Sequence, residues 1–209
     1  MSDDRTDRFG TDIALLVVDA QTAFDDPRWG PRNNPAADAN IEALVELFTA
    51  TGRPRVLVQH SSTNPDGRFH PSQPGHRFKD YLQHVVPDLL VTKSVHSSFH
   101  GTPDLHAWLT EQGVRALVVT GITTNHCCET TARVGGDLGY DVWFALDATH
   151  TFDQVGPDGA LMTADEAARA TATNLHGKFA TVVSTAEIVS MLGPGAVSPS
   201  GRHPGRGRR

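Results

Sequence analysis

The feature that most limits the possible folds of this chain is a set of short, almost continuous apolar runs that recur along its length. Six such runs, rich in Val, Leu and Ile, cover residues 13–19, 55–60, 88–93, 115–121, 141–148 and 180–184. Uninterrupted runs of this length are typical of parallel strands that helices cover on both faces. Half-exposed strands would instead alternate apolar and polar residues. The runs therefore predict buried parallel strands.

Segments with the apolar spacing of amphipathic helices lie between these runs. Three helical faces are formed by Ile41, Leu44, Val45 and Phe48; by Leu105, Trp108 and Leu109; and by Ala167, Ala170 and Leu175. Thr163 precedes the last of them as a predicted helix cap. This alternation predicts an α/β class, doubly wound domain, whose binding site lies beyond the carboxyl ends of the strands. Residues 61–80, rich in Pro, Gly and Ser, predict a long binding loop.

One domain accounts for most of the 209 residues. We expect it to span residues 1–192 and to be followed by a disordered basic tail, residues 193–209. The tail holds four arginines and no acid, so the formal charge of −6 leaves −10 on residues 1–192. An acidic body argues against a nucleic-acid partner, since proteins that bind nucleic acid usually present a basic face.

The sequence also predicts the compartment. Its apolar runs are far shorter than the about 20 residues of a membrane span, and its polar start lacks the apolar region of a signal peptide. Its two cysteines, Cys127 and Cys128, are adjacent and cannot form a disulfide framework. We therefore expect a soluble, cytoplasmic protein with no membrane partner.

Three side chains that could act together in catalysis each follow a different predicted strand. Asp19 ends the first run, Lys93 ends the third, and Cys127 comes just after the fourth. A carboxylate can take the proton of a thiol, and a lysine can keep that carboxylate charged. Asn125 is expected to cap a helix there, and a helix N-terminus would favour a thiolate and offer N–H groups to an oxyanion.

Each of these residues also has an ordinary structural interpretation. An Asp after a strand often caps a turn, a Lys at a strand end is often solvated, and a Cys in an apolar domain is often a small core residue. Their shared position at one sheet edge favours catalysis more than any of them alone. The residues by themselves leave both interpretations open.

Three motifs in order resemble one known family. The matching residues are Asp19, Gln21 and Phe24; Lys93, Ser97, Phe99 and Thr102; and Gly121, Ile122, Thr124 and Cys127. At these positions the chain resembles the isochorismatase-like cysteine hydrolases, which include nicotinamidases and N-carbamoylsarcosine amidohydrolase. The resemblance covers about residues 11–191.

The resemblance implies a three-layer domain with a six-stranded parallel sheet and a catalytic triad of Cys127, Asp19 and Lys93. It implies a cis peptide between Ile122 and Thr123, with the oxyanion bound by backbone N–H groups around these two residues and Cys127. Asp19 would take the thiol proton, Cys127 would attack a carboxamide, lactam or carbamoyl carbon, and water would release the acyl-enzyme. Cys128 stands where the family usually has Val, which favours a packing role.

Two other functions remain open. One branch of the family hydrolyses the vinyl ether of isochorismate, and its members typically lack the cysteine, so Cys127 favours amide chemistry. A non-catalytic binding module on the same fold is the third hypothesis.

The histidines raise the question of a metal. Metal-binding relatives follow the second strand with an Asp-x-His pattern, and here His60 and Ser62 stand at those positions. A site from His60, His70 and His76 is conceivable, but three neutral ligands without the carboxylate depart from the family's site. We expect no metal and no other cofactor.

The residues expected to bind substrate come from the motifs, the strand ends and the 61–80 loop. They are Gln21, Phe24, Trp29, His60, Phe69, His126 and Phe152. This lining suggests a small, polar, partly planar or cyclic amide. The segments ATHTFDQVGPDG and ATNLHGKFATVVS resemble the subgroup that contains streptothricin hydrolase, which opens a lactam. As in many relatives, a homodimer or homotetramer is expected.

Overall fold

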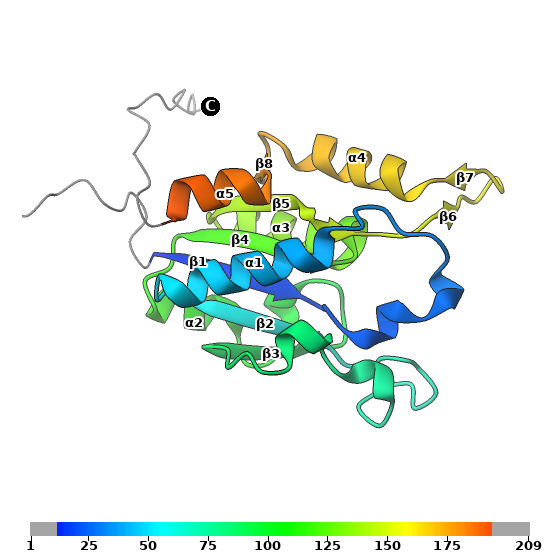
Figure 1. Cartoon of the computed structure of the whole chain (residues 1–209), viewed down its shortest axis with the longest axis horizontal. Helices are drawn as coiled ribbons and strands as arrows, with labels where there is room; N and C mark the ends of the chain where they lie inside the picture. Colours follow the sequence, from blue (N-terminus) through cyan, green and yellow to red (C-terminus); the bar gives the residue numbers. More distant parts are fainter. Residues whose placement is uncertain (1–11, 194–209) are drawn as a thin grey trace, which may run out of the picture.

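The computed structural model describes residues 12–193 and builds them around one parallel sheet of six strands (Figure 1). The strands lie in the order β3-β2-β1-β4-β5-β8, and every neighbouring pair is parallel. Their bounds are β1 Ile13–Val18, β2 Arg55–His60, β3 Leu89–Lys93, β4 Ala116–Ile122, β5 Asp141–His150 and β8 Thr181–Val183. The predicted doubly wound α/β fold is thus confirmed. The expected tail lies outside the described residues, apart from Gly193.

Helices cover both faces of the sheet, and this makes three layers (Figure 1). One face carries α1 (Ala37–Ala50) and α5 (Thr185–Leu192), and the other carries α2 (Leu105–Glu111), α3 (Glu129–Asp137) and α4 (Ala164–Leu175). Alternate residues of β1 enter the two cores: Leu15 packs with α1 and Leu16 packs with α2. Both faces of β1 are therefore buried, which explains its uninterrupted apolar sequence.

Helix α4 confirms the predicted cap residue but not the whole of the predicted buried face. Thr163 and Glu166 form a reciprocal capping box at the start of this helix. Ala170, however, is exposed, because the buried stripe of α4 runs through Ala167, Ala168 and Thr171 instead.

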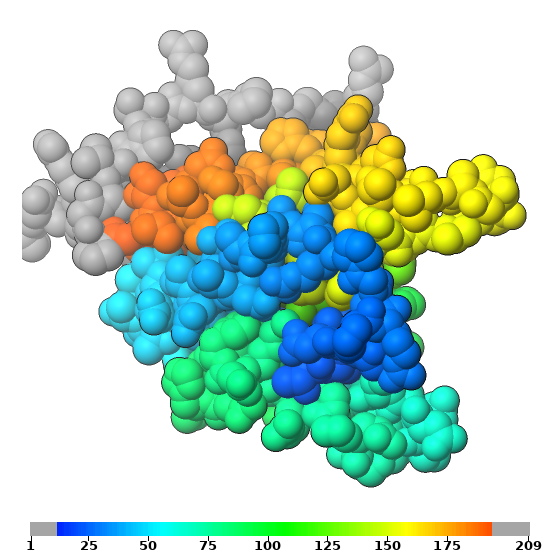
Figure 2. All heavy atoms as spheres, turned by 45° about the vertical axis from the view of Figure 1, so that its right-hand side comes forward, coloured from blue at the N-terminus to red at the C-terminus, as the bar shows by residue number. Residues whose placement is uncertain are grey.

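Irregular segments gather at the carboxyl edge of the sheet. Short helical turns there are η1 Thr22–Asp25, η2 Pro27–Trp29, η3 Pro74–His76, η4 Asp80–Leu82 and η5 Ser98–His100, with a π-helical turn η6 at Thr124–Cys128. A small hairpin of β6 (Gln154–Val155) and β7 (Leu161–Met162) projects from the body. Figure 2 shows the blue segment around η1 and η2 beside the teal 61–80 segment, which a bridge between Gln21 and Phe78 joins.

Within residues 12–193, no helix combines the length and apolar character needed to cross a membrane.

Candidate active site

The parallel sheet brings Asp19 and Lys93 into direct contact. Asp19 follows β1, and Lys93 ends β3, two strands away in the sheet order. The Lys93 ammonium lies 2.6 Å from Asp19 Oδ2, and the two side chains are 0% and 1% exposed. Such a buried pair depends on both partners, because removing either leaves a charge without compensation.

Two backbone features hold this corner of the site. Asp19 adopts a left-handed conformation with φ of 51°, which is uncommon for a residue other than glycine and is often found at functional sites. Gly121, at the end of β4, has φ of 124°, and a Cβ atom there would lie 2.0 Å from the carbonyl oxygen of Val18. The glycine of the third motif is therefore required by the close approach of β4 to the turn that carries Asp19.

Cys127 lies on the turn that follows β4, and its side chain is almost buried. The residue is 8% exposed, and its Sγ lies 3.6 Å from Nδ1 of His96. Burial, and then the negative charge of Asp19, raise the pKa of the Cys127 thiol to about 12, while Lys93 acts in the opposite direction. Attack by this sulfur therefore requires a base and groups that stabilise the thiolate.

The chain around the cysteine differs from the predicted helix start. The peptide between Ile122 and Thr123 is cis, and the π-helical turn Thr124–Cys128 leads directly into α3. Asn125 is not the cap: it lies inside the turn, and its side chain accepts a hydrogen bond from Thr151 Oγ1 at 2.6 Å. The prediction of an Asn125 cap was wrong because the chain begins to wind two residues earlier than the spacing suggested.

Cys128 is fully buried in the apolar core between the sheet and α2 to α4. Burial raises its thiol pKa well above the ordinary value. The two adjacent cysteines therefore have different surroundings, and Cys127 is the one that lines a cavity.

A cavity of about 240 Å³ opens onto the sulfur. Its lining residues are Asp19, Phe24, Trp29, His60, Phe69, His96, Thr123, His126, Cys127, Thr151, Phe152, Asp153 and Gln154. Six of the seven expected substrate-binding residues are among them. Gln21 is not: it is fully buried, and its amide bonds the backbone of His60 and His76, so it joins β2 to the 61–80 loop. Ile122 is also fully buried and outside the lining.

Aromatic rings from distant parts of the chain form one wall of the cavity. Phe24 lies 5.3 Å from Trp29 and 4.9 Å from Phe69, measured between ring centroids. Phe152, which follows β5, lies 5.3 Å from Trp29 with nearly parallel ring planes. The wall can hold a flat or apolar part of a small ligand.

The rest of the lining is polar but carries little positive charge. Burial is the main cause that lowers the pKa of both His60 and His126. The positive charge of Lys93 lowers the pKa of His60 further, and His96 lowers that of His126, so these two rings are neutral at pH 7. Among the described residues, no Lys or Arg lines the cavity, because Lys93 lies behind Asp19. The cavity therefore suits a neutral group better than a carboxylate.

Four lining residues were missed by the sequence analysis: His96, Thr151, Asp153 and Gln154. The strand-end rule could have found them, because His96 comes three residues after β3 and the others follow β5. His150, at the end of β5, was given no role. It is fully buried, neither ring nitrogen has a hydrogen-bond partner among the described residues, and burial lowers its pKa to about 3.

His60, His70 and His76 do not form a set of ligand atoms within 4.8 Å of one another in the described part of the chain. His76 uses Nε2 in a 2.8 Å hydrogen bond with Ser61, and His70 uses Nδ1 in one with Ser72. Within residues 12–193, one set of three ligand atoms lies within 4.8 Å of one another, and it comes from Asp19, His60 and Cys127. These are the groups around the thiol, and Asp19 is already bound to Lys93.

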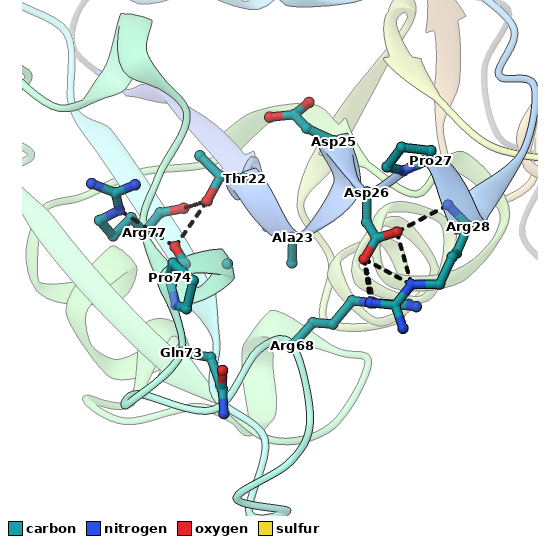
Figure 3. Close-up of a pocket in the computed structure, with 11 residues that line it drawn as sticks. Thr22, Ala23, Asp25, Asp26, Pro27, Arg28, Arg68, Gln73, Pro74 and Arg77 are labelled. Atoms are coloured by element: carbon teal, nitrogen blue, oxygen red, sulfur yellow. Dashed lines mark hydrogen bonds and ion pairs between the residues drawn. The ribbon is translucent and has the colours of Figure 1, made fainter.

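A second hollow, of about 560 Å³, is lined by residues of η1, η2 and the 61–80 loop (Figure 3). The Asp26 carboxylate forms ion pairs with Arg28 at 2.6 Å and with Arg68 at 2.9 Å. The hydrogen bonds from Arg28 hold the pKa of this carboxyl well below its usual range. The Arg68 guanidinium also lies 5.5 Å from the centre of the Trp29 ring. This cluster connects the 61–80 loop, which carries Phe69, to the turn that carries Trp29.

Comparisons with known proteins identify the family and the fold of the chain. Residues 13–187 match the family model described as isochorismatase domain. The uncharacterized isochorismatase family protein YrdC of Bacillus subtilis is 36% identical over 177 residues, covering 85% of this chain and 94% of that protein. Nicotinamidase 3 of Arabidopsis thaliana is 31% identical over 156 residues, covering 71% and 78%. A crystal structure of an isochorismatase-family protein from Chromobacterium violaceum aligns with a TM-score of 0.85 at 35% identity, covering 92% and 99%.

Proposed function

The chain belongs to the isochorismatase family, and from this premise we propose that it is a cysteine-dependent amidohydrolase. It would cleave the C–N bond of a small amide, lactam or carbamoyl compound. The observation that carries the proposal is the buried Asp19–Lys93 pair beside Cys127 at the foot of the cavity. This set provides a nucleophile, a base and a counter-charge in one place.

The proposed reaction uses Asp19 as the proton carrier. Asp19 Oδ1 is buried and has no hydrogen-bond partner among the described residues, so it is available to take the thiol proton. The sulfur attacks the amide carbon, and backbone N–H groups near Thr123 and Cys127 stabilise the oxyanion. Asp19 then protonates the leaving amine, which departs as the thioester forms. Water hydrolyses the thioester, giving its proton to Asp19, which returns it to the sulfur.

The lining favours an amide over the vinyl ether of isochorismate. Isochorismate carries two carboxylates, and proteins usually bind such groups with Arg or Lys. Neither residue lines the cavity within residues 12–193. A neutral, flat or cyclic amide group fits both the aromatic wall and the neutral histidines, and the lactam group of a streptothricin-type substrate is one such group.

The proposal is tested by measuring amine or ammonia release over a panel of compounds. The panel contains nicotinamide, carbamoyl amino acids, biuret, maleamate, simple lactams, streptothricin and isochorismate. Cys127→Ala should abolish release from the active compound while the protein stays folded by circular dichroism. Cys128→Ala is the matched control and should retain activity, because its side chain faces the core.

Other outcomes distinguish the alternatives. Turnover of isochorismate alone would support the ether hydrolase. Full amidase activity in Cys127→Ala would refute the proposed nucleophile. No turnover, together with a Cys127 that is inert to iodoacetamide, would favour a binding module.

A further inference from the structure

His96 contacts the proposed nucleophile and lines the same cavity. Its Nδ1 lies 3.6 Å from Cys127 Sγ, within hydrogen-bond range for sulfur, and the residue is exposed. Asp19, whose ligand atom lies within 4.8 Å of the sulfur, is 1% exposed. The sulfur therefore has both a buried carboxylate and an exposed histidine near it.

The segment that carries His96 is fixed at both ends. On one side, Lys93 Nζ donates to the carbonyl oxygen of Val95 at 3.1 Å, in addition to its bond with Asp19. On the other side, Ser98 is fully buried, and its N–H donates to Thr131 Oγ1 of α3 at 3.1 Å. The position of His96 is therefore coupled to the same lysine that holds Asp19 and to the helix that follows Cys127.

A further hydrogen-bond donor would stabilise the thiolate in this position. Burial and the Asp19 charge both oppose ionisation of Cys127, and Lys93 opposes them only in part. Two of the three N–H groups of Lys93 are engaged by Asp19 and by the carbonyl oxygen of Val95, which leaves at most one for the sulfur. A second N–H donor at the sulfur would stabilise the developing charge, because hydrogen bonds to charged groups are stronger than those between neutral groups.

We propose that His96 is a further catalytic residue, which donates its ring N–H to the sulfur of Cys127 as the thiol ionises and attacks. In this step the thiol proton moves to Asp19, the S–H bonding pair stays on sulfur, and the His96 proton remains on nitrogen. The inference deepens the proposed function and rests on Cys127 being the nucleophile. The titratable and charged groups that surround the contact are Asp19 from the turn after β1, His60 from β2, Lys93 from β3 and His126 from η6.

The test uses the rate at which iodoacetamide alkylates Cys127, followed by mass spectrometry from pH 6 to pH 9. His96→Leu keeps a similar bulk and removes the donor, whereas His96→Gln keeps an N–H donor. His100→Gln is the matched control, because His100 is an exposed histidine of the same segment, on η5. Thermal unfolding of each variant checks that the fold is unchanged.

His96→Leu should slow alkylation at pH 7 by about tenfold or more, the effect expected for one hydrogen bond to a charged group. His96→Leu should therefore need a pH about one unit higher to reach the alkylation rate of the wild type, and kcat/KM for an active amide should fall by about tenfold or more. His96→Gln should restore much of the rate, and His100→Gln should match the wild type. If His96 only shielded the sulfur, His96→Leu would leave the rate unchanged or raise it, and either result overturns the inference.

The two proposals fail in different ways. If alkylation depends on His96 but no amide is turned over, the His96–thiolate contact stands and the proposed function fails. If an amide is hydrolysed through Cys127 and His96→Leu has the wild-type rate and pH profile, the function stands and His96 has no catalytic part.

Discussion

The buried histidine at the end of β5 predicts how the stability of the fold depends on pH. His150 is fully buried, and its ring has no hydrogen-bond partner among the described residues. Burial is the main cause that lowers its pKa from 6.5 to about 3, and the positive charges of Arg32 and Lys79 add to this shift. The folded protein therefore keeps this ring neutral at pH values where the unfolded chain protonates it.

The sign and size of the effect follow from proton linkage. Between pH 6.5 and about pH 3 the unfolded state binds the His150 proton and the folded state does not, so stability falls as the pH is lowered. Each unit corresponds to about 1.36 kcal/mol, so acidification from pH 7.5 to pH 4.5 should cost about 2.7 kcal/mol through this residue. The full stability from this site is present above pH 6.5.

Urea unfolding of the wild type and of His150→Leu at pH 7.5 and pH 4.5 measures this contribution. Leu has a similar volume and cannot titrate, and other ionisable groups cancel in the difference between the two proteins. The stability of His150→Leu relative to wild type should increase by about 2.7 kcal/mol on acidification. His84→Gln, at an exposed histidine, should keep the wild-type pH dependence. Parallel stability–pH curves for His150→Leu and wild type would refute the reasoning.

Three further substitutions test the architecture. Gly121→Ala should prevent folding or lower the free energy of unfolding in urea by at least about 3 kcal/mol, because the new Cβ would meet the Val18 carbonyl oxygen. Gly139 has φ of 94° and open space around it, so Gly139→Ala should lower the same free energy by about 1 kcal/mol. Equal losses in the two variants would contradict the steric argument. Lys93→Met should cost about 3–5 kcal/mol in the same assay and abolish turnover, because the buried Asp19 charge loses its partner; wild-type stability would show that the pair is not needed. Thr163→Ala should lower the melting temperature by the few degrees that about 1 kcal/mol represents, since it removes the cap of α4, and an unchanged melting temperature would contradict this.

Much of the fold was predictable because strands that are buried on both faces of a sheet have uninterrupted apolar sequences. The six apolar runs match the six parallel strands within a few residues, and their carboxyl ends placed Asp19, Lys93 and Cys127 at one edge. Helix starts were less predictable. Thr163 caps its helix through its own side chain, whereas the turn at Thr124–Cys128 begins without a side-chain cap.

Which residues line the cavity depends on an irregular pairing of β4 with β5, which the apolar pattern of the sequence does not predict. The pairing of β4 with β5 shifts register between Val119 and Gly121, so Val119 pairs with Phe144 while Gly121 pairs with Thr149. The Thr120 hydroxyl donates to the carbonyl oxygen of Ala148 inside this irregular stretch. Extra residues of β5 are thereby accommodated within the sheet.

This shift decides which residues follow the strand into the site. β5 runs to His150, two residues beyond the apolar run that predicted it, and so Thr151, Phe152 and Asp153 reach the cavity. A regular ladder would match each residue of β4 with one of β5, and these side chains would then lie elsewhere. Shortening the irregular stretch by one residue should therefore displace Phe152 from the aromatic wall while leaving Asp19 and Lys93 in contact. The expected outcome is a loss of substrate binding with retained iodoacetamide reactivity of Cys127, and loss of both together would show that the two sides of the cavity are not independent.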